Sequence, residues 1–245
     1  MSENMASSIK IGLAVARPND ALAELGKFIA DTDCDLLIFP EGFLDSDEID
    51  EAVEIVRRQL SWVLCGVDDH RPINQKQETA ILFNNHGTIV GEHVKTSLTT
   101  AEIESCYGPG DSLEPLDTPW GKIGIAICYE IHFPEVARTL ALKGARMIIN
   151  PIGTGMWHER QFRQWNAIAS ARASENEVPV VGVSHYNDAI PLAFAYDEWG
   201  DCIVRCRDQN RLVVVDINLP DVTKKRKFDQ RRPELYSIIT QAKNQ

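Results

Sequence analysis

Three residues that can do chemistry each follow a short apolar run of the sequence. Glu41 comes after "DLLIFP", Lys95 after "TIVGEHV" and Cys128 after "KIGIAI". Apolar runs of this length are typical of buried strands, and in open α/β folds ligands bind at the carboxyl ends of the strands. We therefore expect the three side chains to meet at one rim of the fold.

Together these residue types would make a cysteine hydrolase that uses neither histidine nor metal. A cysteine with a pKa of about 8.5 needs a base or a positive field to act as a thiolate near neutral pH. Glu41 can accept the thiol proton, and Lys95 can supply the field and stabilise an oxyanion. Each residue alone is more often a solvated glutamate, an edge lysine or a small buried cysteine. Only their conjunction favours catalysis.

The composition argues against several other classes of function. With 36 acidic and 25 basic residues the chain has a net charge of -11, which repels nucleic acid and anionic membranes. No apolar run approaches the roughly 20 residues of a membrane span, and the first residues lack the pattern of a secretory signal. We expect a cytoplasmic protein that binds neither nucleic acid nor a membrane. Its six cysteines are expected to be free thiols, and no metal or other cofactor is expected.

Short apolar runs alternate with amphipathic stretches along the chain. Strands are predicted over residues 9–16, 35–41, 62–67, 122–128, 146–151 and 178–184, and helices over 19–32, 133–145 and 160–178. This alternation predicts an α/β fold. Residues 78–95 hold two further runs around "NNHG", which indicates a hairpin and favours a mixed sheet or two packed sheets. We expect one domain over residues 1–245, with 1–8 flexible and 221–245 forming a C-terminal tail.

The motifs around the three residues resemble those of the nitrilase superfamily, the carbon–nitrogen hydrolases. These motifs are "IFPEGF", "HVKTSL" and "AICYEIHFPEVAR", and "GPGD", "ARASENEVPVV" and "DQRRPELY" follow in the expected order, from about residue 9 to 236. The resemblance implies a four-layer αββα sandwich of two mixed β-sheets flanked by helices. It also implies a Glu–Lys–Cys triad, Glu41, Lys95 and Cys128, and a homodimer or higher homo-oligomer paired through the outer helices.

The resemblance leaves some positions open. Many members carry a second active-site glutamate, and Glu102 and Glu104 are both candidates here, of which we favour Glu102. Ser97 stands where the lysine motif usually has a histidine, and Glu130 stands where amidase-like members often have aspartate. Both departures leave the triad intact but weaken inference about the substrate.

The residues after Cys128 bear on the type of reaction. Tyr129 and Glu130 resemble the amidase and carbamoyl-hydrolase branches, whereas nitrile-cleaving members typically have Trp-Glu there. We expect a thiol hydrolase that cleaves a small carboxylic amide or N-carbamoyl compound through a cysteine thioester and releases ammonia. The alternatives are a nitrilase, a silent binding or scaffold member, and a glutaminase-like subunit that supplies ammonia.

Residues near the ends of three apolar runs are expected to bind the substrate. They are Tyr129, Glu130, Trp157, His158 and His185. For Trp157 the alternative is a place in the core under the long helix, and for His185 it is an ordinary surface position.

Overall fold

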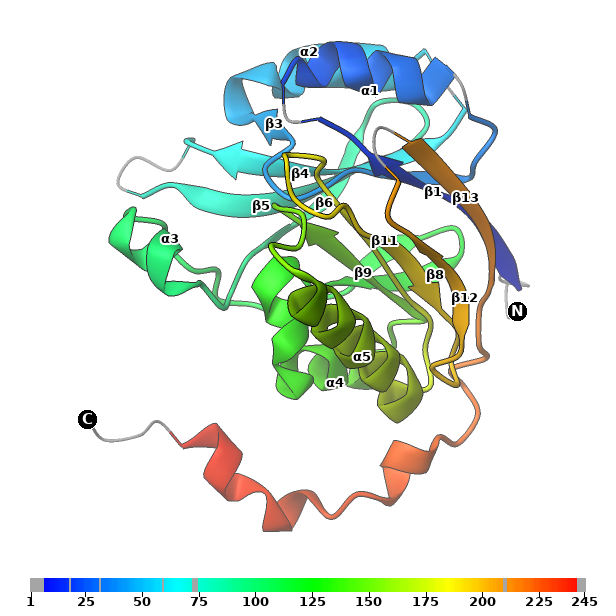
Figure 1. Cartoon of the computed structure of the whole chain (residues 1–245). Coiled ribbons are helices and arrows are strands. Elements are labelled where there is room, and N and C mark those ends of the chain that lie inside the picture. Colours follow the sequence, from blue (N-terminus) through cyan, green and yellow to red (C-terminus); the bar gives the residue numbers. More distant parts are fainter. Residues whose placement is uncertain are drawn as a thin grey trace.

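The computed structural model describes residues 7–17, 19–30, 32–58, 60–71, 75–208 and 211–241. Two β-sheets lie face to face, and helices cover both outer faces (Figure 1). In the described residues the first sheet has the strand order β13-β1-β2-β4-β5-β6, with β3 also paired to β4. Its strands are β1 Ser8–Val15, β2 Leu36–Ile38, β3 Leu44–Asp45, β4 Trp62–Asp69, β5 Gln77–Phe83, β6 Ile89–Val94 and β13 Arg211–Asn218.

The second sheet has the order β12-β11-β10-β9-β8-β7. Its strands are β7 Leu116–Thr118, β8 Gly121–Ile125, β9 Met147–Ile152, β10 Val180–Ser184, β11 Ala193–Tyr196 and β12 Cys202–Cys206. Both sheets are mixed. The strands β1, β2 and β4 run parallel in the first sheet, as does β3 beside β4, and β8, β9 and β10 run parallel in the second. The other pairings of the named strands are antiparallel. The predicted hairpin over 78–95 is confirmed as β5 and β6.

Three apolar clusters separate four layers and confirm the predicted αββα sandwich. The central cluster lies between the sheets and includes Ile11 of β1 and Val183 of β10. A second cluster packs the first sheet against α1 Ala21–Ala30 and α2 Ile49–Val56. A third packs the other sheet against α4 Pro134–Leu142 and α5 Glu159–Asn176. The short α3 Thr100–Glu104 stands at the side (Figure 1).

The strand directions bring the ends of β2, β6 and β8 to one rim. β2 and β4 are parallel, and β6 is antiparallel to β5, which is itself antiparallel to β4. The carboxyl ends of β2 and β6 therefore leave the first sheet at the same edge. β8 of the facing sheet ends close by, because the buried carboxylate of Glu130 joins the two segments. It accepts the backbone N–H of Thr96, just after Lys95, and the backbone N–H of Ile127, just before Cys128.

Helix α2 was not predicted. It holds three acidic residues and buries only Ile49, Ala52 and Val56, spaced by three and four positions. A stripe this narrow is a weak sequence signal, although it is enough to cover part of a sheet. None of the helices in the described residues is both long enough and apolar enough to cross a membrane.

The two ends of the chain differ in what they contact. β1 begins at Ser8, which pairs with Asn218. Ser8 is the last residue of the segment 1–8 that was expected to be flexible, and it belongs to the strand. Residues 1–6 lie outside the described part. After β13 the chain forms three 3₁₀ segments between Lys227 and Thr240, below α4 and α5 (Figure 1). Residues 242–245 of the expected tail also lie outside the described part.

Candidate active site

Lys95 is the centre of the site. It follows β6, and its side chain is 0% exposed. Its Nζ lies 2.6 Å from Oε1 of Glu41 and 2.5 Å from Oε1 of Glu102. A buried ammonium is strongly unfavourable without such partners. The structure thus brings Glu102 to the lysine, and it leaves Glu104 exposed on the same short helix.

Glu41 is fixed from several sides. Its carboxylate accepts a hydrogen bond from the backbone N–H of Gly153 at 2.8 Å as well as the bond from Lys95. Its main-chain oxygen lies 2.7 Å from Nε2 of His185. The backbone at Glu41 passes so close to β4 that a Cβ at Gly66 would lie 2.3 Å from the Cα of Glu41. Glycine at position 66 is therefore needed to seat the glutamate.

Cys128 begins the 3₁₀ turn Cys128–His132, which follows β8 after Ala126 and Ile127. Its φ of 45° lies in the left-handed region, which costs a residue with a side chain about 1–3 kcal/mol. Asn150 of β9 holds this backbone by donating to the main-chain oxygens of Ala126 and Cys128 at 2.6 and 3.2 Å. The Glu41 carboxylate and the backbone N–H of Gly153 lie close enough to the thiol to act on its pKa.

The protonation states follow from burial and from these neighbours. Burial and the Glu41 carboxylate raise the pKa of the Cys128 thiol well above its usual value, against the opposing effect of Lys95. Burial alone would lower the pKa of Lys95, but Glu41, Cys128 and Glu102 raise it overall. Burial also raises the pKa of Glu41, while Lys95 lowers it. The resting site therefore holds an ammonium and a thiol, and the thiol has a carboxyl group within reach of its proton.

Glu130 was expected to bind substrate, but its carboxylate is already fully engaged. It is 0% exposed, and one oxygen accepts from the backbone N–H and the hydroxyl of Thr96 at 2.7 and 2.6 Å. The other accepts from the backbone N–H of Ile127 at 2.7 Å and lies 2.8 Å from Nε2 of His93. Burial would raise the pKa of Glu130, but His93 and Thr96 hold it below its usual value. Glu130 thus ties the segment after Lys95 to the segment before Cys128.

The other expected substrate residues fall into different places. Tyr129 is half-buried next to Cys128 in the sequence, with its ring edge-on to Phe133 at 5.1 Å. His185 is 2% exposed and supports Glu41, so the surface alternative is wrong. Trp157 is 69% exposed, so its core alternative is also wrong.

His158 has a structural task at the start of α5. Its Nδ1 accepts the backbone N–H of Gln161 at 3.1 Å, which caps the helix. Trp157 bonds to the same residue, through its own backbone N–H and Oε1 of Gln161 at 2.7 Å. Substrate contact by Tyr129, Trp157 and His158 stays a prediction.

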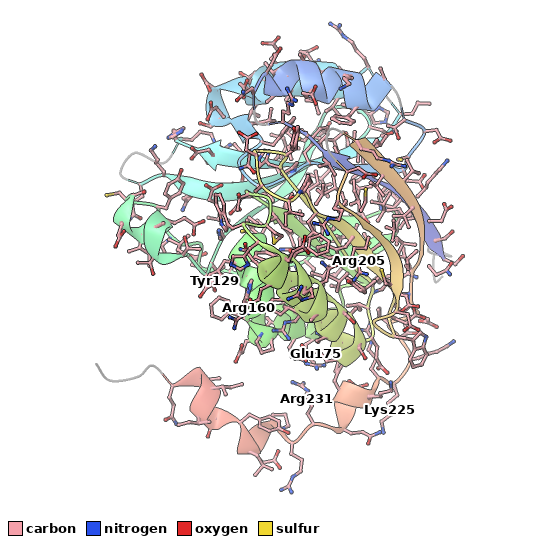
Figure 2. All side chains as sticks on the ribbon, in the orientation of Figure 1. Tyr129, Arg160, Glu175, Arg205, Lys225 and Arg231 are labelled. Atoms are coloured by element: carbon pink, nitrogen blue, oxygen red, sulfur yellow. The ribbon has the colours of Figure 1, made fainter. Side chains whose placement is uncertain are left out.

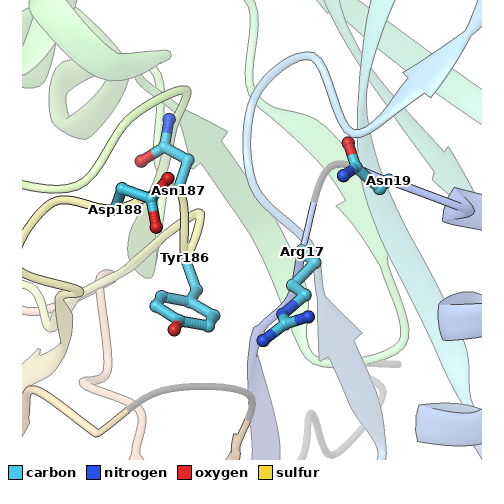
Figure 3. A pocket seen from close by; sticks show the side chains of 5 residues that line it. All are labelled: Arg17, Asn19, Tyr186, Asn187 and Asp188. Atoms are coloured by element: carbon cyan, nitrogen blue, oxygen red, sulfur yellow. The ribbon is translucent and has the colours of Figure 1, made fainter.

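A polar cavity of about 360 Å³ lies at the ends of β1 and β10. Figure 3 shows Arg17 and Tyr186 at its centre, with the guanidinium 5.1 Å from the ring centroid. Its other lining residues are Asn19, Asn187 and Asp188. Asn187 accepts the backbone N–H of Gly155 at 3.1 Å, and so anchors the loop that carries Gly153.

Elsewhere, the ligand atoms of Asp45, Asp68 and His70 lie within 4.8 Å of one another. Asp68 already accepts the Tyr107 hydroxyl, and we assign no ion there.

Comparison with known proteins agrees with this geometry. Residues 15–227 match the model of the carbon-nitrogen hydrolase family. Deaminated glutathione amidase of Mus musculus is 30% identical, over 97% of this chain and 81% of that protein. Omega-amidase NIT2 of Bos taurus is 25% identical, over 80% of this chain and 76% of that protein.

Solved structures show the same fold at lower identity. A carbon-nitrogen hydrolase from Helicobacter pylori G27 matches with a TM-score of 0.86 at 18% identity, over 96% of this chain and 99% of that chain. A variant of the amidase from Nesterenkonia sp. AN1, with the acetamide moiety of fluoroacetamide on its active-site cysteine, matches with a TM-score of 0.79 at 20% identity, over 96% and 97%. The chain belongs to the carbon–nitrogen hydrolase family.

Proposed function

We propose that the protein is an amidase that hydrolyses a small carboxylic amide through a thioester on Cys128 and releases ammonia. The observation that carries this proposal is the Lys95 ammonium, buried between Glu41 and Glu102, beside a Cys128 thiol that lies close enough to Glu41 and Lys95 for both to shift its pKa. The names of the amidase relatives support the same reaction class. N-carbamoyl compounds contain the same C–N bond and remain within the proposed substrate range.

The first half-reaction forms the thioester. The Cys128 thiol gives its proton to the Glu41 carboxylate as the sulfur attacks the carbonyl carbon. The carbonyl oxygen becomes an oxyanion, which the Lys95 ammonium and a backbone N–H of the turn after Cys128 stabilise. The C–N bond then breaks, the nitrogen takes the proton from Glu41, and ammonia leaves.

The second half-reaction consumes water. Glu41, again a carboxylate, takes a proton from a water molecule that attacks the thioester carbon. The C–S bond breaks, and the sulfur takes the proton back from Glu41. One amide and one water molecule thus give one carboxylic acid and one ammonia. Glu102 keeps Lys95 in place and charged throughout.

We further propose a homodimer paired through α4, α5 and the segment of residues 221–241. Four apolar side chains of this segment are exposed in the single chain, namely Leu235, Tyr236, Ile238 and Ile239 at 59%, 45%, 71% and 60%. Exposed apolar patches of this kind mark interaction surfaces. Figure 2 shows Glu175 of α5 and Arg231 of the segment, which line one cavity together with Tyr236 and Ile239.

We also propose a cytoplasmic location. The cysteines are all free thiols, which fits the reducing environment of the cytoplasm.

Ammonia release over a substrate panel tests the proposed reaction. The panel contains short aliphatic amides, ω-amides and N-carbamoyl amino acids, with a nitrile series beside them. We expect at least one amide to be hydrolysed, and Cys128→Ala to lower the rate about a thousandfold or more. Amide hydrolysis by Cys128→Ala at the wild-type rate, or turnover of nitriles alone, would contradict the proposal.

A further inference from the structure

Glu78 stands beside the catalytic lysine, yet the mechanism above does not use it. It lies on β5, where it pairs with Asp68 of β4, and its main-chain oxygen accepts the backbone N–H of Lys95 at 2.8 Å. Directly paired residues of antiparallel strands point to the same face of a sheet. The side chains of Asp68, Glu78 and Lys95 therefore form one row on one face.

The carboxyl group of Glu78 has a buried oxygen without a partner. Its Oε2 is shielded from solvent and makes no hydrogen bond. It lies 3.7 Å from the position of a Cβ on Gly42, next to Glu41. By contrast, Glu41 and Glu102 share the Lys95 ammonium, and Asp68 accepts the Tyr107 hydroxyl at 2.9 Å.

Most of the groups around Glu78 are acidic and disfavour another negative charge. The neighbours are Glu41 after β2, Asp68 on β4, Lys95 after β6, Glu102 on α3 and the Tyr107 hydroxyl after α3. The positive group among them, Lys95, is already bonded to two carboxylates. A carboxylate directly opposite Asp68 is destabilising. Burial, with Glu41 and Asp68, raises the pKa of Glu78 to about 9, although Lys95 opposes this.

We propose that Glu78 is a further positioning residue of the active site, one that works with its carboxyl group protonated and slows the reaction when it loses that proton. This inference rests on the proposed amidase function. A neutral Glu78 leaves the positive potential of Lys95 available to the oxyanion. A third carboxylate beside Lys95 would reduce that potential and so weaken the stabilisation of the tetrahedral intermediate.

Few other groups of the site titrate in the same range. Burial raises the pKa of the Cys128 thiol well above its usual value, and burial together with Asp68 raises that of Tyr107 above its usual range. The carboxylates around Lys95 raise its pKa as well, against the effect of burial. An alkaline fall in activity with a midpoint near pH 9 is therefore the expected signature of Glu78.

Kinetics over pH 6 to 10.5 test the positioning role, with each protein compared to its own rate at pH 7. For wild type we expect kcat/KM on the amide hydrolysed fastest to be about tenfold lower at pH 10, because a single proton is lost near pH 9. Glu78→Gln keeps the group uncharged and should remove the fall. Glu104→Gln makes the same change at an exposed position and should keep it. A Glu78→Gln variant with the wild-type fall, or one that is folded but inactive at pH 7, overturns the proposal.

Infrared difference spectroscopy tests the protonation state without any turnover. The carbonyl band of a protonated carboxylic acid should be present at pH 7, disappear between about pH 8 and 10, and be absent from Glu78→Gln but present in Glu104→Gln. A Glu78→Gln spectrum identical to wild type overturns the proposal. A protein that hydrolyses no amide would refute the proposed function, and this spectrum would still decide whether Glu78 is protonated.

Discussion

Glu130→Gln is expected to destabilise the protein strongly, although it changes only one oxygen into an amide nitrogen. The carboxylate accepts four hydrogen bonds, two on each oxygen, from Thr96, Ile127 and His93. An NH₂ group accepts none, so either orientation of the glutamine loses two bonds and places a donor against donors. At about 1.5–3 kcal/mol for each bond to a charged group, the loss is about 3–6 kcal/mol. This is a large share of a typical stability of about 5–15 kcal/mol.

The assay is urea unfolding at pH 7, with Glu104→Gln as the matched control. The control should stay within about 0.5 kcal/mol of wild type, since Glu104 is exposed. Because the pKa of Glu130 lies below its usual value, its contribution is present at neutral pH and is lost as the pH falls through the folded-state pKa. The difference between variant and wild type should therefore shrink in acid. A Glu130→Gln protein within about 1 kcal/mol of wild type at pH 7 would refute this reasoning.

Three further changes have distinct expected outcomes. Lys95→Met leaves the buried carboxylate of Glu41 and the partly buried carboxylate of Glu102 without their cation, so we expect activity to be lost and stability to fall by about 3–5 kcal/mol in denaturant unfolding. Amide hydrolysis by Lys95→Met at the wild-type rate would rule out a catalytic role for Lys95. Glu78→Gln should raise the melting temperature at pH 8 but not at pH 4. Above pH 4.5 the unfolded wild-type chain releases the Glu78 proton while the folded protein keeps it, and this lowers the free energy of unfolding of wild type by up to about 1.4 kcal/mol per pH unit. Equal melting curves at pH 8 would contradict this. Trp157→Ala should change stability by less than about 1 kcal/mol, as its ring is 69% exposed. A rise in KM would show substrate contact, and an unchanged KM would remove Trp157 from the substrate site.

The meeting of Glu41, Lys95 and Cys128 could be predicted because it depends on strand ends. Each residue follows an apolar run, and the directions of β2, β6 and β8 bring those ends together. This prediction did not depend on how far apart the three residues lie in the sequence. Glu102 was favoured over Glu104 through the family resemblance alone, and the structure then brought Glu102 to the lysine and left Glu104 exposed.

The supporting contacts could not be predicted in this way, because they depend on which face of a loop each side chain takes. His185 reaches the main chain of Glu41 across 144 positions of sequence. Glu130 was expected to bind substrate because it lies near the end of an apolar run, two residues after Cys128. Its actual partners, Thr96 and His93, flank Lys95 on the facing sheet, so only the packing of the two sheets reveals its role.

The most direct test of the central claim is the mass of the enzyme caught during turnover. Wild type and Cys128→Ala would be mixed with the amide hydrolysed fastest, quenched in acid within one turnover, and measured as intact proteins, with the modified peptide then sequenced. The account predicts an adduct equal to the acyl group on the Cys128 peptide of wild type, ammonia released in equal amount, and neither product from Cys128→Ala. An acyl adduct on another residue, or ammonia release by Cys128→Ala at the wild-type rate, would contradict it.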